Sequence, residues 1–189
     1  MKNKSIFIPI FILFTLVLTS CGKATDIKPM SLGDADAPVV IEEFSDVQCP
    51  ACGQISPQVE DVARSNPDIV RLDFYHFPLP YHEFAFIGAE AAECAEDQGK
   101  GWEYLAQEYA NQTSLSNDFF MTLAENLKLN TETFKTCMDD HLKKEKIQQH
   151  VLFGKERGIP GTPTLFVNGQ MIQWPNADQF DAYVKSLAK

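Results

Sequence analysis

The chain has 189 residues, of which 44% are hydrophobic, and a formal net charge of −10 at pH 7. This length is enough for one well-buried domain or for a small domain with an insertion. The acidic balance argues against a nucleic acid or an anionic lipid surface as the main partner, because both repel a negatively charged protein.

The first residues are typical of an export signal. Two lysines precede an apolar run over residues 6–18, which is too short to span a bilayer comfortably, and small residues follow it. The sequence Leu-Thr-Ser-Cys at 18–21 resembles the bacterial lipoprotein cleavage box, in which the cysteine, here Cys21, is lipidated. The resemblance implies a signal peptide over 1–20 and a membrane anchor made of several acyl chains. An ordinary secretory signal and an uncleaved anchor are the alternatives.

Residues 21–37 are predicted to be a tether that lifts the domain off the membrane, because they hold Lys, Asp, Ser, Gly and Pro without periodicity. The β-branched run at 39–44 is apolar on both faces apart from its acids, which favours a buried central strand. A helix is predicted over 50–64, and Pro57 is expected to kink it.

A pair of cysteines, Cys49 and Cys52, stands between this strand and this helix in the sequence Cys-Pro-Ala-Cys. A C-x-x-C directly after a strand is a redox signal in an exported protein. Pro50 suits the first turn of a helix, so Cys49 lies at the positive end of the helix dipole, where the thiolate is favoured. Cys52 falls inside the first turn, close enough for a short disulfide but less open to a macromolecule. We therefore expect Cys49 to attack and Cys52 to resolve.

An acid in the preceding strand completes this candidate site. Glu43 shares strand parity with Val39 and Ile41, so its carboxyl is predicted to point into the apolar face beneath the helix, whereas Glu42 faces the other way. A buried carboxyl has a raised pKa and can carry a proton to or from Cys52. In a slipped register, Glu43 would instead be an exposed edge acid.

The middle of the chain predicts a second strand and then a helical block. Residues 69–77 alternate as a strand does. From 83 to 152 the apolar spacing is helical, and glycines interrupt it. Ser116 and Thr131 are expected N-caps, and the charged stretch 139–150 is expected to be a solvated helix face.

The C-terminal part predicts a turn, a hairpin and a helix. A turn cluster at 158–163 precedes a strand at 164–167. The Asn-Gly pair at 168–169 is a strong signal for a two-residue hairpin loop into 170–172. Asn176 is the expected N-cap of a closing amphipathic helix.

The two remaining cysteines, Cys94 and Cys137, lie in different predicted helices. Outside the cytosol two such thiols are expected to be joined, and their disulfide would staple the helical block. By the chain-entropy estimate it could stabilise the fold by about 4 kcal/mol. A redox relay with Cys49 is the sharper alternative.

A zinc site is a weaker reading of the cysteine pair. Such a site needs four ligands, usually in two close pairs, and the chain has one C-x-x-C. His76 and His82 are expected to be a packed or turn residue each. No metal and no further cofactor is therefore expected, and the disulfide itself would carry the redox chemistry.

The order strand, C-x-x-C, helix, strand, helical block, Thr-Pro, hairpin and helix resembles the DsbA family of thiol:disulfide oxidoreductases. These are α/β proteins with a thioredoxin-like fold and an inserted helical domain. The likeness covers about 36–187 and is carried by Glu-Phe-Ser at 43–45, Cys-Pro-Ala-Cys at 49–52, His-Phe-Pro-Leu-Pro at 76–80, Ala-Ala-Glu-Cys at 91–94, Gln-Gly-Lys at 98–100 and Gly-Thr-Pro-Thr at 161–164. It implies a thioredoxin-like domain over 38–82 and 153–189, with a helical insertion over 83–152.

The resemblance also implies roles for single residues. Cys49 would be the exposed nucleophile, and Cys52 would resolve the mixed disulfide. Pro163 would be a cis proline packed against the sulfurs, and the backbone of Thr162 would pair with an extended substrate segment. Strongly oxidising members carry Pro-His between the cysteines, whereas this chain has Pro-Ala, so the couple is expected to be less oxidising. An apolar patch at 77–81 is expected near the rim of the site, although ordinary packing would explain it equally well.

The sequence thus predicts a monomeric, lipid-anchored enzyme of the cell envelope that oxidises cysteine pairs in exported polypeptides. A membrane redox partner would recycle its Cys49–Cys52 pair. A thiol reductase or isomerase is one alternative. Another is a lipoprotein binding module in which the cysteine pair is only a staple, but Glu43, Pro50 and Pro163 argue against it, because a structural disulfide needs none of them.

Overall fold

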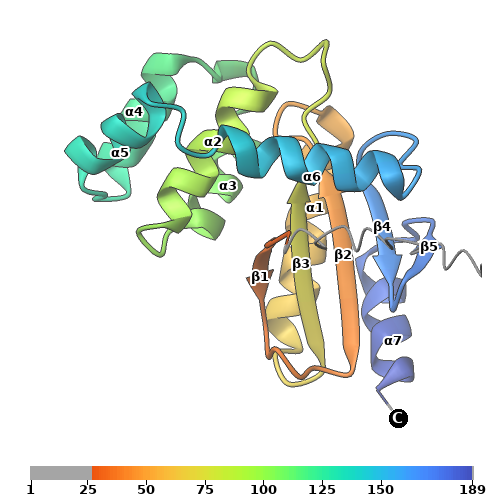
Figure 1. Cartoon of the computed structure of the whole chain (residues 1–189). Coiled ribbons are helices and arrows are strands. Elements are labelled where there is room, and N and C mark those ends of the chain that lie inside the picture. Colours follow the sequence, from red (N-terminus) through yellow and green to blue (C-terminus); the bar gives the residue numbers. More distant parts are fainter. Residues whose placement is uncertain (1–26, 189) are drawn as a thin grey trace, which may run out of the picture.

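The computed structural model describes residues 27–188 of a mixed α/β chain (Figure 1). Its strands are β1 Met30–Leu32, β2 Val39–Ser45, β3 Val70–His76, β4 Thr164–Val167 and β5 Gln170–Ile172. Its helices are α1 Pro50–Ser65, α2 Ala85–Glu96, α3 Gly101–Ala110, α4 Asn117–Asn126, α5 Thr131–Asp139, α6 Lys144–Glu156 and α7 Ala177–Leu187, with a 3-10 turn η1 at Gln112–Ser114. The expected signal peptide and Cys21 lie outside the described residues. Within the described part, no helix is long and apolar enough to cross a membrane.

The strands form one sheet in the order β1-β3-β2-β4-β5. The central strand β2 is parallel to β3 and antiparallel to β4, while β1 and β5 pair antiparallel at the two edges. In Figure 1, α1 and α7 lie behind the sheet and α6 crosses in front of it. Because β2 is central, the cysteine pair that follows it lies at the middle of the sheet's end.

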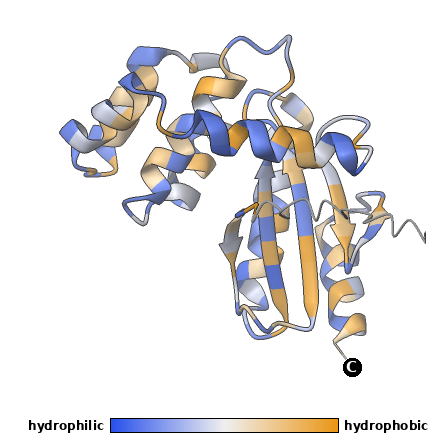
Figure 2. Ribbon diagram, viewed as in Figure 1, coloured by the Kyte–Doolittle hydropathy of each residue, from blue (hydrophilic) through white to orange (hydrophobic). Residues whose placement is uncertain are grey.

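The two covered faces explain why β2 is apolar on both sides. Val39 and Ile41 are fully buried in the core beneath α1 and α7. Phe44 points to the other face, where it stacks on Tyr75 with ring centroids 4.9 Å apart and packs near Phe166. Figure 2 shows the matching pattern, with apolar residues along β4 and both polar and apolar residues along α6.

The segment predicted as a tether contains a strand. Met30–Leu32 pairs antiparallel with β3, and the Met30 side chain is 1% exposed. Gly33 follows at φ +96°, where any side chain would collide with the Val70 carbonyl. A three-residue strand with a single buried side chain is too short to give a periodic signal, which is why the sequence prediction was wrong here.

The helical block differs from the prediction in two places. Ser116 caps α4 as expected, but the cap of α5 is Asn130, whose side chain accepts the Thr133 N–H, instead of Thr131. The stretch 139–150 is also not one solvated face. α5 ends at Asp139, α6 begins five residues later at 144, and His150 is fully buried, because α6 runs from the insertion across the sheet and must bury one side.

The C-terminal part agrees with the sequence prediction. Asn168 and Gly169 both have positive φ, at 47° and 79°, and join β4 to β5 as a two-residue loop. Asn176 caps α7 by accepting the N–H of Gln179.

The predicted partner cysteines, Cys94 of α2 and Cys137 of α5, form a disulfide with their Cα atoms 6.0 Å apart. This bond lies wholly within the helical block.

Candidate active site

The cysteine pair lies where β2 passes into α1. Cys49 is the N-cap of the helix and Pro50 occupies its first position, as the sequence predicts. Both cysteines are free thiols, with Cys52 fully buried and Cys49 8% exposed. Cys49 is thus the more accessible sulfur, but it is more covered than the expected exposed nucleophile, because the backbone of Thr162 lies against it.

The backbone that covers the Cys49 sulfur belongs to the loop between α6 and β4. The Cys49 thiol donates to the Thr162 carbonyl across 3.4 Å, and the Thr162–Pro163 peptide bond is cis. The predicted neighbours of the sulfurs are therefore brought together from positions more than 110 residues apart. A cavity of about 480 Å³ adjoins this loop and is lined by it together with Ile55, Met171 and Trp174. An extended segment that pairs with the Thr162 backbone would lie beside this cavity.

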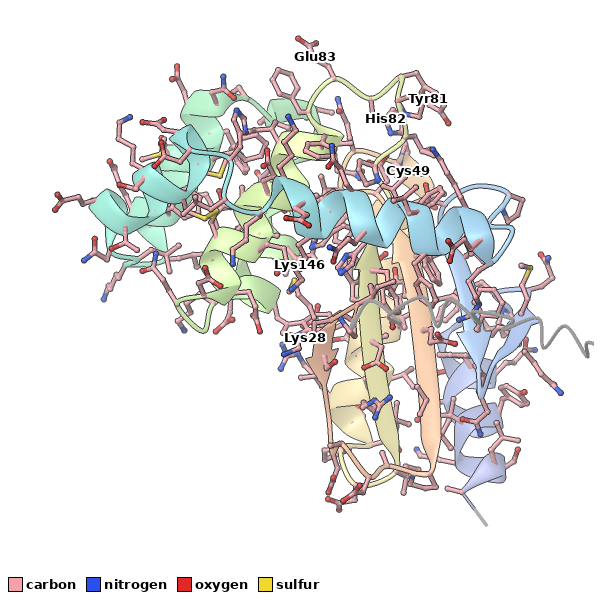
Figure 3. All side chains as sticks on the ribbon, viewed as in Figure 1. Lys28, Cys49, Tyr81, His82, Glu83 and Lys146 are labelled. Carbon is pink, nitrogen blue, oxygen red and sulfur yellow. A yellow bond between two sulfur atoms is a disulfide. The ribbon has the colours of Figure 1, made fainter. Side chains whose placement is uncertain are left out.

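The short loop before Cys49 is held by a buried carboxylate. Asp46 accepts the N–H groups of Gln48 and Leu79, each at 2.7 Å, and contacts Nδ1 of His82 at 2.8 Å. Figure 3 shows His82 on the loop above Cys49. Asp46 therefore ties the active-site loop to the loop between β3 and α2.

The helical block holds the same loop from its other side. The side-chain amide of Gln112, in η1, donates to the Val47 carbonyl at 2.9 Å and to the Cys49 carbonyl at 2.8 Å. A Cβ at Gly53 would lie 2.4 Å from the Gln112 amide oxygen, so a larger residue there would displace the Gln112 side chain from this position. The insertion thus fixes the backbone at the attacking cysteine.

Glu43 lies beneath the cysteines, as strand parity predicts. Its side chain is 1% exposed, and the Ser56 hydroxyl of α1 donates to its Oε1. Burial raises the pKa of Glu43 to about 7, with hydrogen bonds from Ser56 and Ser45 opposing the rise. This carboxyl can therefore either hold or release a proton near neutral pH. Glu42 faces the opposite side and pairs with Arg157 at 2.7 Å.

Burial also dominates at the second cysteine. It raises the pKa of the Cys52 thiol well above its ordinary value, and the Ser45 hydroxyl opposes this. The Ser45 and Ser56 hydroxyl oxygens are 2.9 Å apart, and the Tyr109 hydroxyl donates to Ser45 across 3.1 Å. A thiol in this environment needs a nearby group to take up its proton before it can attack.

Sequence reasoning missed these three hydroxyl residues. Ser45 shares strand parity with Glu43, and Ser56 follows Cys52 by one helical turn, so period-2 and period-4 patterns together could have placed both at the site. Tyr109 comes from α3 in the insertion. No local pattern connects it with the cysteines, because its contact with Ser45 spans 64 residues.

The two histidines weighed as ligands have separate environments. His76 is buried, with Nε2 3.5 Å from Oε1 of Glu93, and His82 is engaged by Asp46. Across the described residues, no three His, Cys, Asp or Glu side chains are grouped to hold a metal ion. An apolar groove of about 700 Å³ runs beside His82, between the 77–80 segment and α6. It coincides with the patch expected at the rim of the site.

The chain resembles known proteins over most of its length. A family model described as thioredoxin matches residues 25–186. Two sodium/proton antiporters, NhaA 3 of Salinispora tropica and NhaA 1 of Salinispora arenicola, are 35% and 36% identical to it. These matches cover 82% and 73% of this chain but 24% and 21% of the antiporters, so the chain spans about a quarter of the length of these relatives.

Solved structures share its fold. The thiol-disulfide exchange protein alpha-DsbA2 of Wolbachia pipientis superposes with a TM-score of 0.76 at 17% identity, over 86% of this chain and 88% of that one. BdbD of Bacillus subtilis gives 0.70 at 23% identity, over 85% and 92%. DsbA2 of Pseudomonas aeruginosa gives 0.62 at 27% identity, over 75% and 82%. The family match over most of the chain shows that it belongs to the thioredoxin family, and its fold, with a helical insertion, is similar to that of these DsbA proteins.

Proposed function

We propose that this protein is an extracytoplasmic thiol:disulfide oxidoreductase that oxidises cysteine pairs in exported polypeptides. The observation that carries the proposal is the packing of Cys49 against the carbonyl of Thr162, next to the cis Pro163. A substrate segment that pairs with the Thr162 backbone would present its cysteine to Cys49. Membership of the thioredoxin family and the likeness in fold to DsbA proteins support the same reaction class.

In the oxidising direction the enzyme starts with a Cys49–Cys52 disulfide. A substrate thiolate attacks the Cys49 sulfur, a substrate–Cys49 bond forms, and Cys52 leaves with the electron pair of the broken bond. A second substrate thiolate then attacks the substrate sulfur, and Cys49 leaves as a thiolate at the N-terminus of α1, where the helix dipole stabilises it. The substrate loses two electrons and the enzyme is left as a dithiol.

The same two sulfurs can run the reaction in reverse, which makes a thiol reductase or isomerase the second candidate. Pro-Ala between the cysteines supplies no side-chain hydrogen bond or positive charge to a Cys49 thiolate, so the dithiol is less stabilised than in strongly oxidising relatives. A binding module that uses the disulfide as a staple is the third candidate. The buried carboxyl of Glu43 beneath the pair favours the enzyme over the staple, because a staple gains nothing from a titrating acid.

The cellular context belongs to the same proposal. An anchor at Cys21 would hold the domain at a membrane facing away from the cytoplasm, as a monomer close to its substrates. A membrane redox protein would accept the electrons that remain on Cys49 and Cys52 after each cycle. Metabolic labelling with a fatty acid, compared between the full chain and Cys21→Ser, tests the anchor. Label on both variants would contradict it.

The reduction potential of the Cys49–Cys52 couple decides between these readings and can be measured by equilibration with glutathione. A value between about −120 and −180 mV fits an oxidase or isomerase, whereas about −270 mV fits a reductase. A value far below about −300 mV would indicate a structural disulfide and overturn the proposal. Cys49→Ser should abolish exchange with a substrate peptide, and undiminished exchange in that variant would rule out both enzyme readings.

A further inference from the structure

A closed polar path joins the buried cysteine to the buried acid. Ser45 and Ser56 are 1% and 4% exposed, and their hydroxyl oxygens are 2.9 Å apart. The Ser56 hydroxyl donates to the Glu43 carboxyl, and the Ser45 hydroxyl acts on both ends of the path, because its hydrogen bonding lowers the pKa of the Cys52 thiol and of Glu43. The two hydroxyls therefore lie between the thiol and the carboxyl, in a part of the core that is shielded from solvent.

The path arises from two backbone periodicities. Glu43 and Ser45 are two residues apart on β2 and point to the same face of the sheet. Cys52 and Ser56 are four residues apart on α1, and both are buried on the side of the helix that faces β2. The strand and the helix thus each supply one hydroxyl between the thiol and the carboxyl.

We propose that Ser45 and Ser56 pass a proton between the Cys52 sulfur and the Glu43 carboxyl, while Tyr109 of the helical insertion holds Ser45 in place. This inference rests on the proposed function and deepens it, because it names the route by which the second cysteine is protonated and deprotonated. Ser45 touches the reacting sulfur. Ser56 and Tyr109 act through Ser45.

The same path can carry a proton to Cys52 when it leaves a disulfide and away from Cys52 when it attacks one. When Cys52 leaves as a thiolate, the Ser45 hydroxyl protonates the sulfur, the Ser56 hydroxyl restores the proton on Ser45, and the Glu43 carboxylic acid restores the one on Ser56. Glu43 ends as a carboxylate. When the Cys52 thiol attacks a mixed disulfide at Cys49, the proton runs along the same path to Glu43, a Cys49–Cys52 bond forms, and the substrate leaves as a thiolate.

The Tyr109 hydroxyl orients the Ser45 hydroxyl within the path. A hydroxyl offers one proton and two lone pairs. Since Ser45 accepts the Tyr109 hydroxyl on one lone pair, its own proton is available to Cys52. Its second lone pair can accept from Ser56 when Glu43 is protonated and Ser56 no longer donates to it. Without the Tyr109 hydroxyl, Ser45 could turn away from this arrangement.

The surroundings of Glu43 leave the two serine hydroxyls as its polar connection to the thiol. Its partners in the sheet are Phe74 on β3 and Leu165 on β4, and both are buried and apolar. The titratable groups that act on Glu43 or on its path are Cys49, Cys52 and Glu60 at or on α1 and Tyr109 of α3, and the negative charge of Glu60 raises the pKa of Glu43 further.

The test follows a single resolving step in the full-length protein. A mixed disulfide with glutathione is formed at Cys49, and the rate at which Cys52 releases glutathione is measured against pH, in H₂O and in D₂O. Ser45→Ala and Ser56→Ala should slow the release by about a hundredfold, the low end of what general acid–base catalysis contributes. In the wild type the rate of glutathione release should rise around pH 7, where Glu43 becomes able to accept a proton. Both alanine variants should lose this rise. Ser45→Thr and Ser56→Thr keep a hydroxyl and should recover most of the rate.

Matched variants separate a relay from mere packing. Ser65→Ala lies on α1 at an exposed position and should behave as the wild type. Tyr109→Phe keeps the ring and removes the hydroxyl, so it should shift the pH profile and reduce the solvent isotope effect. If the alanine variants do not fold, Tyr109→Phe and the threonine variants decide the question.

Two failures can be told apart. Wild-type pH profiles and isotope effects in the alanine variants, or in Tyr109→Phe if these do not fold, would overturn the relay and leave the proposed oxidoreductase intact. A wild-type protein that neither forms nor resolves a mixed disulfide would overturn the oxidoreductase, and the relay would fall with it.

Discussion

Glu43 has to be buried and yet exchange a proton, and its surroundings satisfy both needs. Desolvation alone would keep a carboxyl protonated well past neutral pH, because the charged form is disfavoured in an apolar environment. The hydroxyls of Ser45 and Ser56 favour the carboxylate and bring the pKa back to about 7. Because this pKa is close to neutral pH, the carboxyl can either donate a proton to the Cys52 sulfur or accept one from it.

The raised pKa of Glu43 makes stability depend on pH. The contribution is fully present below pH 4.5, where the carboxyl is protonated in the folded and unfolded states alike, and it is lost as pH rises towards 7, because the unfolded chain ionises first. From the difference in pKa, the loss amounts to about 3 kcal/mol. In Glu43→Gln, the free energy of unfolding, measured with urea at pH 4 and pH 8, should fall by that much less than in the wild type.

Glu42→Gln is the control, because it removes the same formal charge from the opposite face of the same strand. It should leave the decline of the wild type between pH 4.5 and 7 in place. An unchanged decline in Glu43→Gln would mean that the carboxyl does not titrate where its burial places it.

Single residues differ in how far the sequence alone could predict them. Cys49, Cys52 and Glu43 were predictable because each follows from one local rule: a motif, a helix start or strand parity. The disulfide partners Cys94 and Cys137 followed from counting cysteines. Tyr109 was not predictable, because its hydroxyl reaches Ser45 only after the insertion has docked.

At the scale of elements, helix α5 shows how the structure selects one of two neighbouring residues as the N-cap. Asn and Thr stand next to each other at 130 and 131, and either can cap a helix. The structure uses Asn130, whose backbone also pairs with the side chain of Gln98 through both its N–H and its C=O. This long-range pairing fixes where α5 begins.

The two candidate caps give a direct comparison. Asn130→Ala removes the side-chain acceptor of the Thr133 N–H and should lower the free energy of unfolding by about 1 kcal/mol. Thr131→Ala, in the first turn, should change it by a few tenths at most. Thermal unfolding of both variants followed by circular dichroism measures this. A larger effect at Thr131 would place the cap where the sequence suggested it.

The elements that the sequence misjudged share a physical cause. β1 has three residues, and its pairing with β3 is decided by a partner about forty residues away. The stretch 139–150 is mostly exposed, as expected, but Ile147 and His150 are buried, because α6 passes from the insertion over the sheet and these two side chains meet contacts outside their own helix. Periodicity reports what a segment can bury, whereas tertiary contacts decide what it does bury.

At the scale of the whole molecule, the insertion is coupled to the redox centre by polar contacts as well as by packing. Gln112 holds the backbone at Cys49, and Tyr109 reaches Ser45. Farther away, Glu93 of α2 lies between His76 of β3 and the Lys146 ammonium of α6, which donates to it at 2.6 Å. Although burial raises the pKa of Glu93, these two partners outweigh it and hold the value at about 2. The insertion thus supports the site rather than merely covering it.

The Cys94–Cys137 disulfide tests whether that support is mechanical or redox-active. It joins residues 43 apart within the insertion, so its loss should lower the free energy of unfolding by up to about 4 kcal/mol by the chain-entropy estimate. The double variant Cys94→Ala/Cys137→Ala removes the bond without leaving an unpaired thiol. A mechanical staple predicts that this variant melts earlier but keeps the Cys49–Cys52 potential within about 30 mV of the wild type, a change of about 1.4 kcal/mol.

A redox relay predicts the opposite result for the same variant. Electrons would then pass between the two pairs, and removing one pair would stop turnover with substrate peptide while the fold stayed intact. We expect the structural role. Below its melting temperature, the variant should oxidise a dithiol peptide at the wild-type rate, because Cys94 and Cys137 join α2 to α5 whereas Cys49 and Cys52 lie at the start of α1. Loss of turnover without loss of structure would assign the second disulfide to the reaction path.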